Sequence, residues 1–119
     1  MARILIMDDE AIVLGFLQSI FERLGHDVAV VMDGLEGLRL FREEPADLVI
    51  VDLMLPGRAG LLVIEEIHLH FPDASIVALS GSLNPKPLEK AKALGARLAF
   101  QKPFDLDAFL LKVAEALAG

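Results

Sequence analysis

The strongest constraint on the fold of this chain is an alternation of short apolar runs with segments of helical periodicity, repeated five times. Runs such as Leu48-Val49-Ile50-Val51 lack polar and apolar alternation, as expected for strands covered on both faces. The predicted strands are Arg3–Met7, Asp27–Met32, Asp47–Val51, Ser75–Leu79 and Arg97–Gln101.

Between these runs, apolar residues recur every three or four positions, which places them on one face of a helix. Gly25 and Gly95 stand where C-terminal caps belong. Asp33 and Asp105 stand where N-caps belong, and Glu36 makes the first an acidic variant of a capping box. The helical stripes are Val13, Phe16, Leu17, Ile20, Leu24; Leu35, Leu38, Phe41; Leu61, Ile64, Ile67, Phe71; Leu88, Ala91, Leu94; and Leu106, Phe109, Leu110, Val113, Leu117.

Strands that alternate with helices in this way are parallel and joined by right-handed crossovers. Five such units in 119 residues are too few for an eightfold barrel, which needs roughly 250. The sequence therefore predicts one α/β domain over residues 1–119, an open, doubly wound (βα)5 parallel sheet. Such sheets bind their ligands beyond the carboxyl ends of the strands.

Composition excludes several function classes. The chain has no cysteine, which rules out disulfides, thiolate metal sites and a cysteine nucleophile. It carries 11 Lys and Arg against 18 Asp and Glu, a net charge of −7, which argues against direct binding to nucleic acid or to an anionic membrane. The start has no signal-peptide pattern, and the apolar runs are far shorter than the roughly 18 residues of a membrane span. We expect a cytoplasmic protein.

Reactive side chains follow four of the five predicted strands, where they would share one sheet edge. They are Asp8, Asp9 and Glu10, then Asp52, Ser80 and Lys102. Oxygen ligands of this kind suit Mg²⁺, and a lysine with a hydroxyl suits a phosphoryl group. A carboxylate can itself accept a phosphoryl group, and Asp52, at the end of the most apolar strand, is the best candidate.

Four sequence blocks surround these reactive residues. The blocks are Ile4-Leu5-Ile6-Met7-Asp8-Asp9-Glu10, Asp52-Leu53-Met54-Leu55-Pro56-Gly57 with Gly60, Ser80-Gly81, and Gln101-Lys102-Pro103-Phe104. Together they resemble the receiver (CheY-like) domain of bacterial two-component response regulators, over the whole chain. The resemblance implies the strand order 2-1-3-4-5 and a phosphorylation-dependent signalling switch rather than a conventional enzyme.

The resemblance also implies roles for single residues. Asp52 would be the phosphoacceptor. Asp9 would bind Mg²⁺ directly, Asp8 mainly through water, and the backbone carbonyl of Met54 would be a further ligand. The Ser80 hydroxyl would move toward the phosphoryl group on activation. Lys102 would contact a phosphoryl oxygen, oriented by a cis peptide bond before Pro103.

In the family, a sensor histidine kinase or a His phosphotransfer protein supplies the phosphoryl group. The output of phosphorylation is a change in the surface formed by the fourth helix, the fifth strand and the fifth helix. A downstream effector or output domain binds this surface. A homodimer formed on phosphorylation through the fourth and fifth helices stays open, because no charge pattern demands it. Whether the chain acts alone or belongs to a longer regulator also stays open.

Two positions depart from the family's pattern. Where the family carries Tyr or Phe, three residues before the lysine, this chain has Ala99, and Phe100 should face the other side of the sheet. The usual aromatic relay is therefore in doubt. Ala59 stands where many members carry a small polar cap for the third helix, a loss of about 1 kcal/mol.

Other interpretations compete with these. Glu10 could extend the acidic cluster, but a first-turn acid favoured by the helix dipole is preferred. His68 and His70, two positions apart on a helix, diverge and indicate surface residues. The rival functions are an Asp-nucleophile phosphohydrolase, a flavodoxin-like cofactor binder, and a degenerate receiver that binds partners without phosphorylation.

Overall fold

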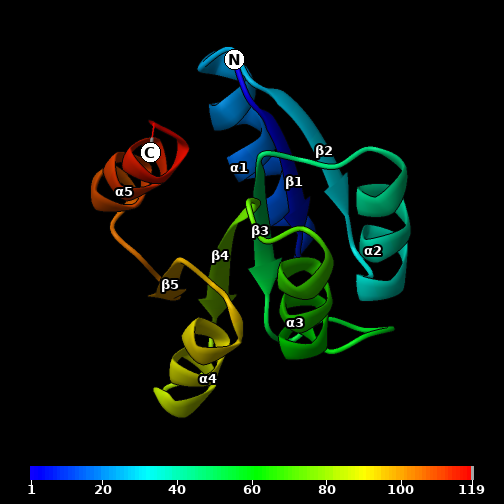
Figure 1. Cartoon of the computed structure of the whole chain (residues 1–119). Coiled ribbons are helices and arrows are strands. Elements are labelled where there is room, and N and C mark those ends of the chain that lie inside the picture. The colour runs from blue at the N-terminus through cyan, green and yellow to red at the C-terminus, as the bar shows by residue number, and fades with distance from the viewer. Residues whose placement is uncertain (119) are drawn as a thin grey trace.

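Five parallel strands form one sheet in the order β2-β1-β3-β4-β5 in the computed structural model, which describes residues 1–118 (Figure 1). The strands are β1 Arg3–Met7, β2 Asp27–Val31, β3 Leu48–Asp52, β4 Ser75–Ser80 and β5 Leu98–Gln101. The helices are α1 Ala11–Arg23, α2 Gly34–Glu43, α3 Gly60–His70, α4 Lys86–Leu94 and α5 Leu106–Ala118. The predicted (βα)5 alternation and strand order are confirmed.

β1 has its predicted bounds, and the bounds of the other four strands differ from those predicted by one residue. β3 and β4 each run one residue further, because Asp52 pairs with Leu79 and Ser80 pairs with Gln101 in the parallel ladder. This extension places two predicted site residues on the last rungs of the sheet rather than in loops. Their backbones are therefore fixed by interstrand hydrogen bonds.

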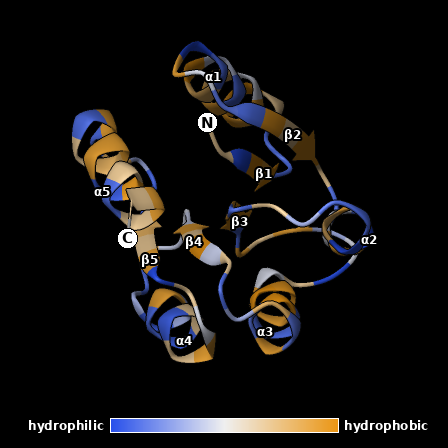
Figure 2. Cartoon of the chain, turned by 45° about the horizontal axis from the view of Figure 1, so that its top comes forward, coloured by the Kyte–Doolittle hydropathy of each residue, from blue (hydrophilic) through white to orange (hydrophobic). Residues whose placement is uncertain are grey.

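Helices cover both faces of the sheet. Figure 2 shows α1 and α5 on one side and α2, α3 and α4 on the other, with apolar residues turned toward the strands. Every residue of β3 and β4 is buried, which explains their lack of alternation. Each large side chain buried here, such as Ile50 or Phe109, stabilises the fold by about 1.5–3 kcal/mol.

The predicted caps are present. Asp33 Oδ1 accepts the backbone N–H groups of Leu35 (2.8 Å) and Glu36 (3.1 Å) at the start of α2. Asp105 Oδ1 accepts the N–H of Asp107 (3.1 Å) at the start of α5. Ala59 precedes α3 and has no polar side chain with which to cap it. α2 and α5 therefore begin on a carboxylate cap, whereas α3 does not.

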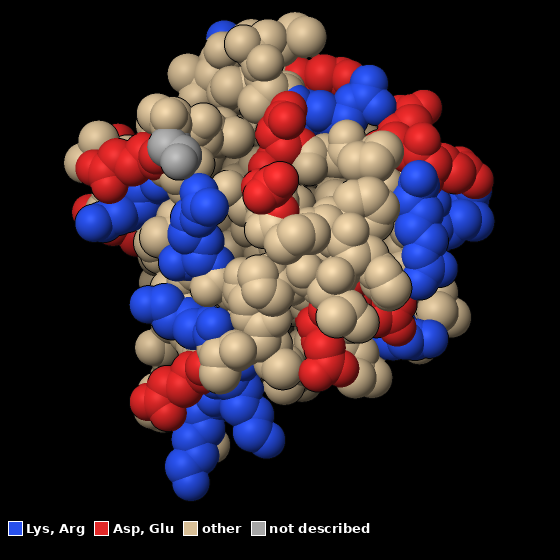
Figure 3. Space-filling view, in the orientation of Figure 1, with Lys and Arg blue, Asp and Glu red and all other residues tan. Residues whose placement is uncertain are grey.

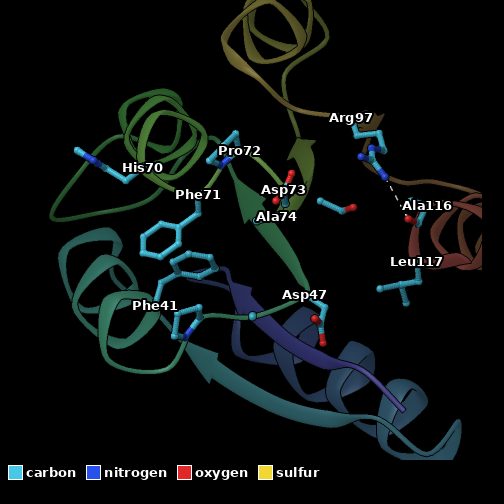
Figure 4. A pocket seen from close by; sticks show the side chains of 13 residues that line it. Phe41, Asp47, His70, Phe71, Pro72, Asp73, Ala74, Arg97, Ala116 and Leu117 are labelled. Carbon is cyan, nitrogen blue, oxygen red and sulfur yellow. Dashed lines mark hydrogen bonds between the residues drawn. The ribbon is translucent and has the colours of Figure 1, made fainter. Parts of the chain in front are cut away.

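A cavity of about 680 Å³ opens at the amino edge of the sheet, at the end opposite the predicted site (Figure 4). Phe41 and Phe71 meet edge to face across its wall, with ring centroids 4.8 Å apart. Arg97 Nη1 donates to the carbonyl of Ala116 (3.1 Å) at its rim. None of the residues predicted to carry chemistry lines this cavity.

Within residues 1–118, no helix has the length and apolar character that crossing a bilayer requires.

Candidate functional site

Lys102 lies at the centre of the site, where three strands end. It follows β5, and its ammonium donates to Asp8 Oδ2 beyond β1 (2.8 Å) and to Asp52 Oδ2 at the end of β3 (3.0 Å). Its third partner is Glu10 Oε1, at 2.9 Å. All three N–H bonds of the ammonium are therefore directed to carboxylates. The parallel sheet brings these residues together because its strands end at one edge.

Four carboxylates gather at this edge of the sheet, and three of them accept from the Lys102 ammonium. Asp8, Asp9, Glu10 and Asp52 each offer an oxygen within 4.8 Å of the others. The side chains of Asp8 and Asp52 are buried, whereas Asp9 and Glu10 are exposed. Since four negative charges meet one positive charge, the site retains an excess of negative charge that a cation would neutralise.

The two buried carboxylates are held in the same way. One oxygen of Asp8 accepts the backbone N–H of Glu10 (2.9 Å), and the other accepts from Lys102. One oxygen of Asp52 accepts the backbone N–H of Met54 (2.9 Å), and the other again accepts from Lys102. Both carboxylates are thus oriented by the loop that follows their own strand and by a lysine that follows a third strand, β5.

The electrostatic environment shifts two groups. Burial raises the pKa of Asp8 above its ordinary value, hydrogen bonds from Lys102 and from the Glu10 backbone partly oppose this, and the charge of Asp52 adds to the rise. Burial alone would lower the pKa of Lys102, but its hydrogen bonds to Asp8, Glu10 and Asp52 raise it above the ordinary value. The lysine is therefore a permanent cation at neutral pH.

Not every predicted residue meets the others through its side chain. Ser80 is buried, and its hydroxyl oxygen accepts the N–H of Ser82 (3.1 Å). Its carbonyl accepts the N–H of Lys102 (2.7 Å), so it adjoins the site through its backbone. The Met54 side chain is 68 % exposed, which is compatible with a role for its backbone alone. The peptide bond between Lys102 and Pro103 is cis, as expected.

For Glu10 the preferred sequence interpretation was wrong. Glu10 precedes α1 at the N-cap position, and its carboxylate accepts from Lys102 rather than serving the helix. The partner lies 92 positions away, which explains why local sequence could not reveal it. His68 and His70 are exposed, in agreement with their interpretation as surface residues.

Ala99 and Phe100 face opposite sides of the sheet, as predicted. Ala99 packs with the cluster under α2, α3 and α4. Phe100 packs under α1 and α5, where its ring meets Phe109 edge to face at 5.0 Å. Phe100 therefore does not occupy the space that an aromatic residue at position 99 would fill.

Comparison with known proteins identifies the family. The profile of the response regulator receiver domain matches residues 4–114. Protein PilH of Pseudomonas aeruginosa is 31 % identical over 121 residues, covering 100 % of both chains. Sporulation initiation phosphotransferase F of Bacillus subtilis is 28 % identical over 105 residues, covering 88 % of this chain and 85 % of that protein.

Solved structures agree. A CheY-like response regulator receiver domain protein from Methanospirillum hungatei superimposes with a TM-score of 0.92 at 28 % identity, covering 98 % of this chain and 93 % of that one. The similarity in sequence and the similarity in structure thus both cover the part of the chain that holds the four carboxylates. An acidic cluster at this edge is typical of the metal site of such domains, which interact with histidine kinases and phosphotransferases. The chain belongs to the response regulator receiver domain family, the signalling modules of two-component systems.

Proposed function

We propose that Asp52 accepts a phosphoryl group from a phosphohistidine of a partner protein, and that this modification switches the chain's binding surface. The observation that carries the proposal is the position of Lys102, whose ammonium links the buried Asp52 and Asp8 carboxylates. A lysine held there can pass from a carboxylate oxygen to an oxygen of the incoming phosphoryl group, whose negative charge it would stabilise.

In the transfer, one carboxylate oxygen of Asp52 forms a bond to phosphorus while the bond between phosphorus and the histidine nitrogen breaks. The electron pair of that bond leaves with the imidazole. The N–H of Met54 and the ammonium of Lys102 orient the Asp52 carboxylate for the attack. The buried Ser80 hydroxyl lies one rung beyond the Asp52–Leu79 pair and would donate to a phosphoryl oxygen after leaving Ser82. The product is an aspartyl phosphate, which water hydrolyses.

The donor set fits Mg²⁺, because it consists of oxygens only and carries excess negative charge. Asp8, Asp9, Asp52 and the Met54 carbonyl would hold the ion. When bound, it would neutralise charge on the carboxylates and on the phosphoryl oxygens.

An apolar surface beside the site suits a partner that must bring its histidine close. A groove of about 440 Å³ lies between α1 and the segment after β5. Lys102 and Glu10 line it together with apolar side chains such as Ile12, which is 87 % exposed, and Phe16, which is 52 % exposed. We assign this groove to the phosphohistidine-bearing helix of the donor, because it is continuous with Lys102.

The test is incubation of the chain with Mg²⁺ and acetyl phosphate, followed by intact-mass measurement. We expect one added phosphoryl group that hydroxylamine removes and that EDTA prevents. Asp52→Asn should stay unmodified, whereas Asp73→Asn, an exposed aspartate at the far edge of the sheet, should behave like the wild type.

An unchanged mass at saturating donor would instead favour a receiver that binds partners without phosphorylation. Turnover of many generic phosphate esters would favour a phosphohydrolase.

A further inference from the structure

The loop 53–59, between β3 and α3, packs directly against the start of α2. The carbonyl of Pro56 accepts the N–H of Gly34 at 3.0 Å. A Cβ on Gly34 would lie 2.3 Å from the carbonyl oxygen of Arg58, and a Cβ on Gly57 would lie 2.2 Å from Asp33 Oδ2. At Gly34 the approach is too close for any side chain, and Gly57 has a φ of 81°, which favours glycine, so the loop rests on the start of α2 at Gly34.

The same loop holds the buried carboxylate of the site. The N–H of Met54 donates to Asp52 Oδ1 at 2.9 Å. Leu53, just before it, donates to the carbonyl of Leu79 (2.9 Å) and accepts from Gly60 (3.4 Å). The orientation of the Met54 peptide, and with it the Asp52 carboxylate, therefore depends on where this loop lies.

A side-chain cluster ties the outer part of the loop to α2 and α3. Glu66 of α3 receives Arg58 of the loop on one carboxylate oxygen and Arg42 of α2 on the other, the latter at 2.9 Å. Arg58 is 35 % exposed and Glu66 26 %, whereas Arg42 is 59 % exposed. Figure 3 shows basic and acidic side chains lying against one another over this part of the surface.

We propose that Arg58 and Glu66 are positioning residues for the metal site: their ion pair holds the loop 53–59 so that the Met54 carbonyl and the Asp52 carboxylate are presented together to a divalent cation. This inference rests on the proposed function. Arg42 shares the same glutamate but lies on α2, outside the loop, and so does not orient Met54 directly.

The direction in which Mg²⁺ affinity changes on replacing Arg58 distinguishes a positioning role from a purely electrostatic one. Removing an arginine removes a positive charge, which by long-range electrostatics alone would strengthen Mg²⁺ binding, weakly because salt screens it. Loss of the Arg58–Glu66 ion pair, which anchors the loop 53–59, would instead weaken Mg²⁺ binding. Arg58→Ala should therefore weaken Mg²⁺ binding even though it makes the protein more negative.

The experiment measures Mg²⁺ affinity of the full chain by isothermal titration, with no phosphodonor present. We expect Arg58→Ala to weaken binding by about twofold to fivefold, the range of a partly exposed ion pair. Arg42→Ala should leave the affinity unchanged or slightly stronger. Arg58→Lys should lie between the wild type and Arg58→Ala, since it keeps the charge but not the fork.

Thermal unfolding of each variant shows whether it is folded. Should Arg58→Ala not fold, Arg58→Gln keeps most of the side chain and permits the same comparison. Equal effects of the Arg58 and Arg42 variants, or stronger Mg²⁺ binding by both, would overturn the positioning role. Failure of the wild-type chain to bind Mg²⁺ would overturn the metal site of the proposed function, a result distinct from any difference between variants.

Discussion

The ammonium of Lys102 lies 3.0 Å from the carboxylate of Asp52, a residue 50 positions away in the sequence, and 2.8 Å from that of Asp8. The lysine thus offsets part of the repulsion between two carboxylates that are both buried. Its side chain is 13 % exposed, so solvent screens these pairs only weakly. Both the stability of the fold and the proposed chemistry therefore depend on this cation, and substitutions of Lys102 and of Asp8 separate the two.

Lys102→Met should destabilise the chain by about 3 kcal/mol in metal-free buffer, because it leaves buried carboxylates without their cation. Added Mg²⁺ should raise the melting temperature of this variant more than that of the wild type, since the ion would replace the missing charge. Calorimetry with and without Mg²⁺ measures both effects. Lys112→Met, at an exposed position on α5, is the control. A Mg²⁺ response no larger than that of the wild type would count against a metal site beside Lys102.

Asp8→Asn should stabilise the metal-free chain by on the order of 1 kcal/mol near neutral pH while it weakens Mg²⁺ binding. The pKa of Asp8 is raised in the fold, mainly by burial, so ionising this group costs folding free energy. Lys102 keeps two other carboxylate partners in the variant.

The pH dependence of this gain follows from the same shift. Below about pH 3.8, Asp8 is protonated in both folded and unfolded chains, and asparagine resembles it, so the gain should vanish. As pH rises through the folded-state pKa, the wild type pays the ionisation cost and the gain should reach its full size. Urea unfolding at several pH values gives the difference. A stabilisation by Asp8→Asn that stays constant with pH would contradict the raised pKa of Asp8 as its cause.

Phe16→Ala should slow phosphotransfer from a histidine-bearing protein donor by roughly fivefold to tenfold, the effect of an apolar interface residue. It should leave the rate with acetyl phosphate unchanged, because Phe16 lies in the adjoining groove and not among the acids. Leu69→Ala, exposed on α3, is the matched control. Single-turnover transfer assays with both donors measure these rates. An equal loss with each donor would contradict the prediction, because it would place Phe16 in the chemistry rather than in docking.

Gly60→Ala should destabilise the chain by about 1–3 kcal/mol and reduce phosphorylation of Asp52. A Cβ at Gly60 would lie 2.5 Å from the Asp52 carbonyl oxygen and 2.6 Å from Leu53 Cα, both backbone atoms that cannot turn aside. Gly15→Ala is the opposite case: its Cβ would meet nothing within 4 Å on α1, and it should stabilise by about 0.5–1 kcal/mol. Chemical denaturation of the two variants tests the contrast.

Local pattern was enough to predict the architecture. A continuous apolar run such as 48–51 indicates a strand buried on both faces, and an apolar stripe such as that of α5 indicates a helix buried on one face. Both patterns can be recognised from residues that are close together in the sequence. The caps at Asp33 and Asp105 were predictable for the same reason, since a cap needs only the next three residues. Strand order needed the added information of the family resemblance.

The details of the site lie beyond such patterns. The partnership of Glu10 with Lys102 joins residues 92 positions apart, and helix-dipole reasoning about Glu10 alone led to the wrong interpretation. The pair of Arg58 and Glu66 depends on how the loop 53–59 lies between two helices. Neither Arg58 nor Glu66 belongs to a sequence motif that would indicate a role in the site.

By itself the sequence determined the kind of fold, the sheet edge at which chemistry gathers, and the residues Asp8, Asp9, Asp52 and Lys102 as members of one site. Only the tertiary structure decided which carboxylate oxygens face the Lys102 ammonium, that Ser80 turns its hydroxyl toward Ser82, and that the loop 53–59 is anchored through Arg58. The reason is physical: periodicity records burial, which each residue experiences locally, whereas hydrogen bonds depend on distances of a few ångströms between side chains that packing brings together.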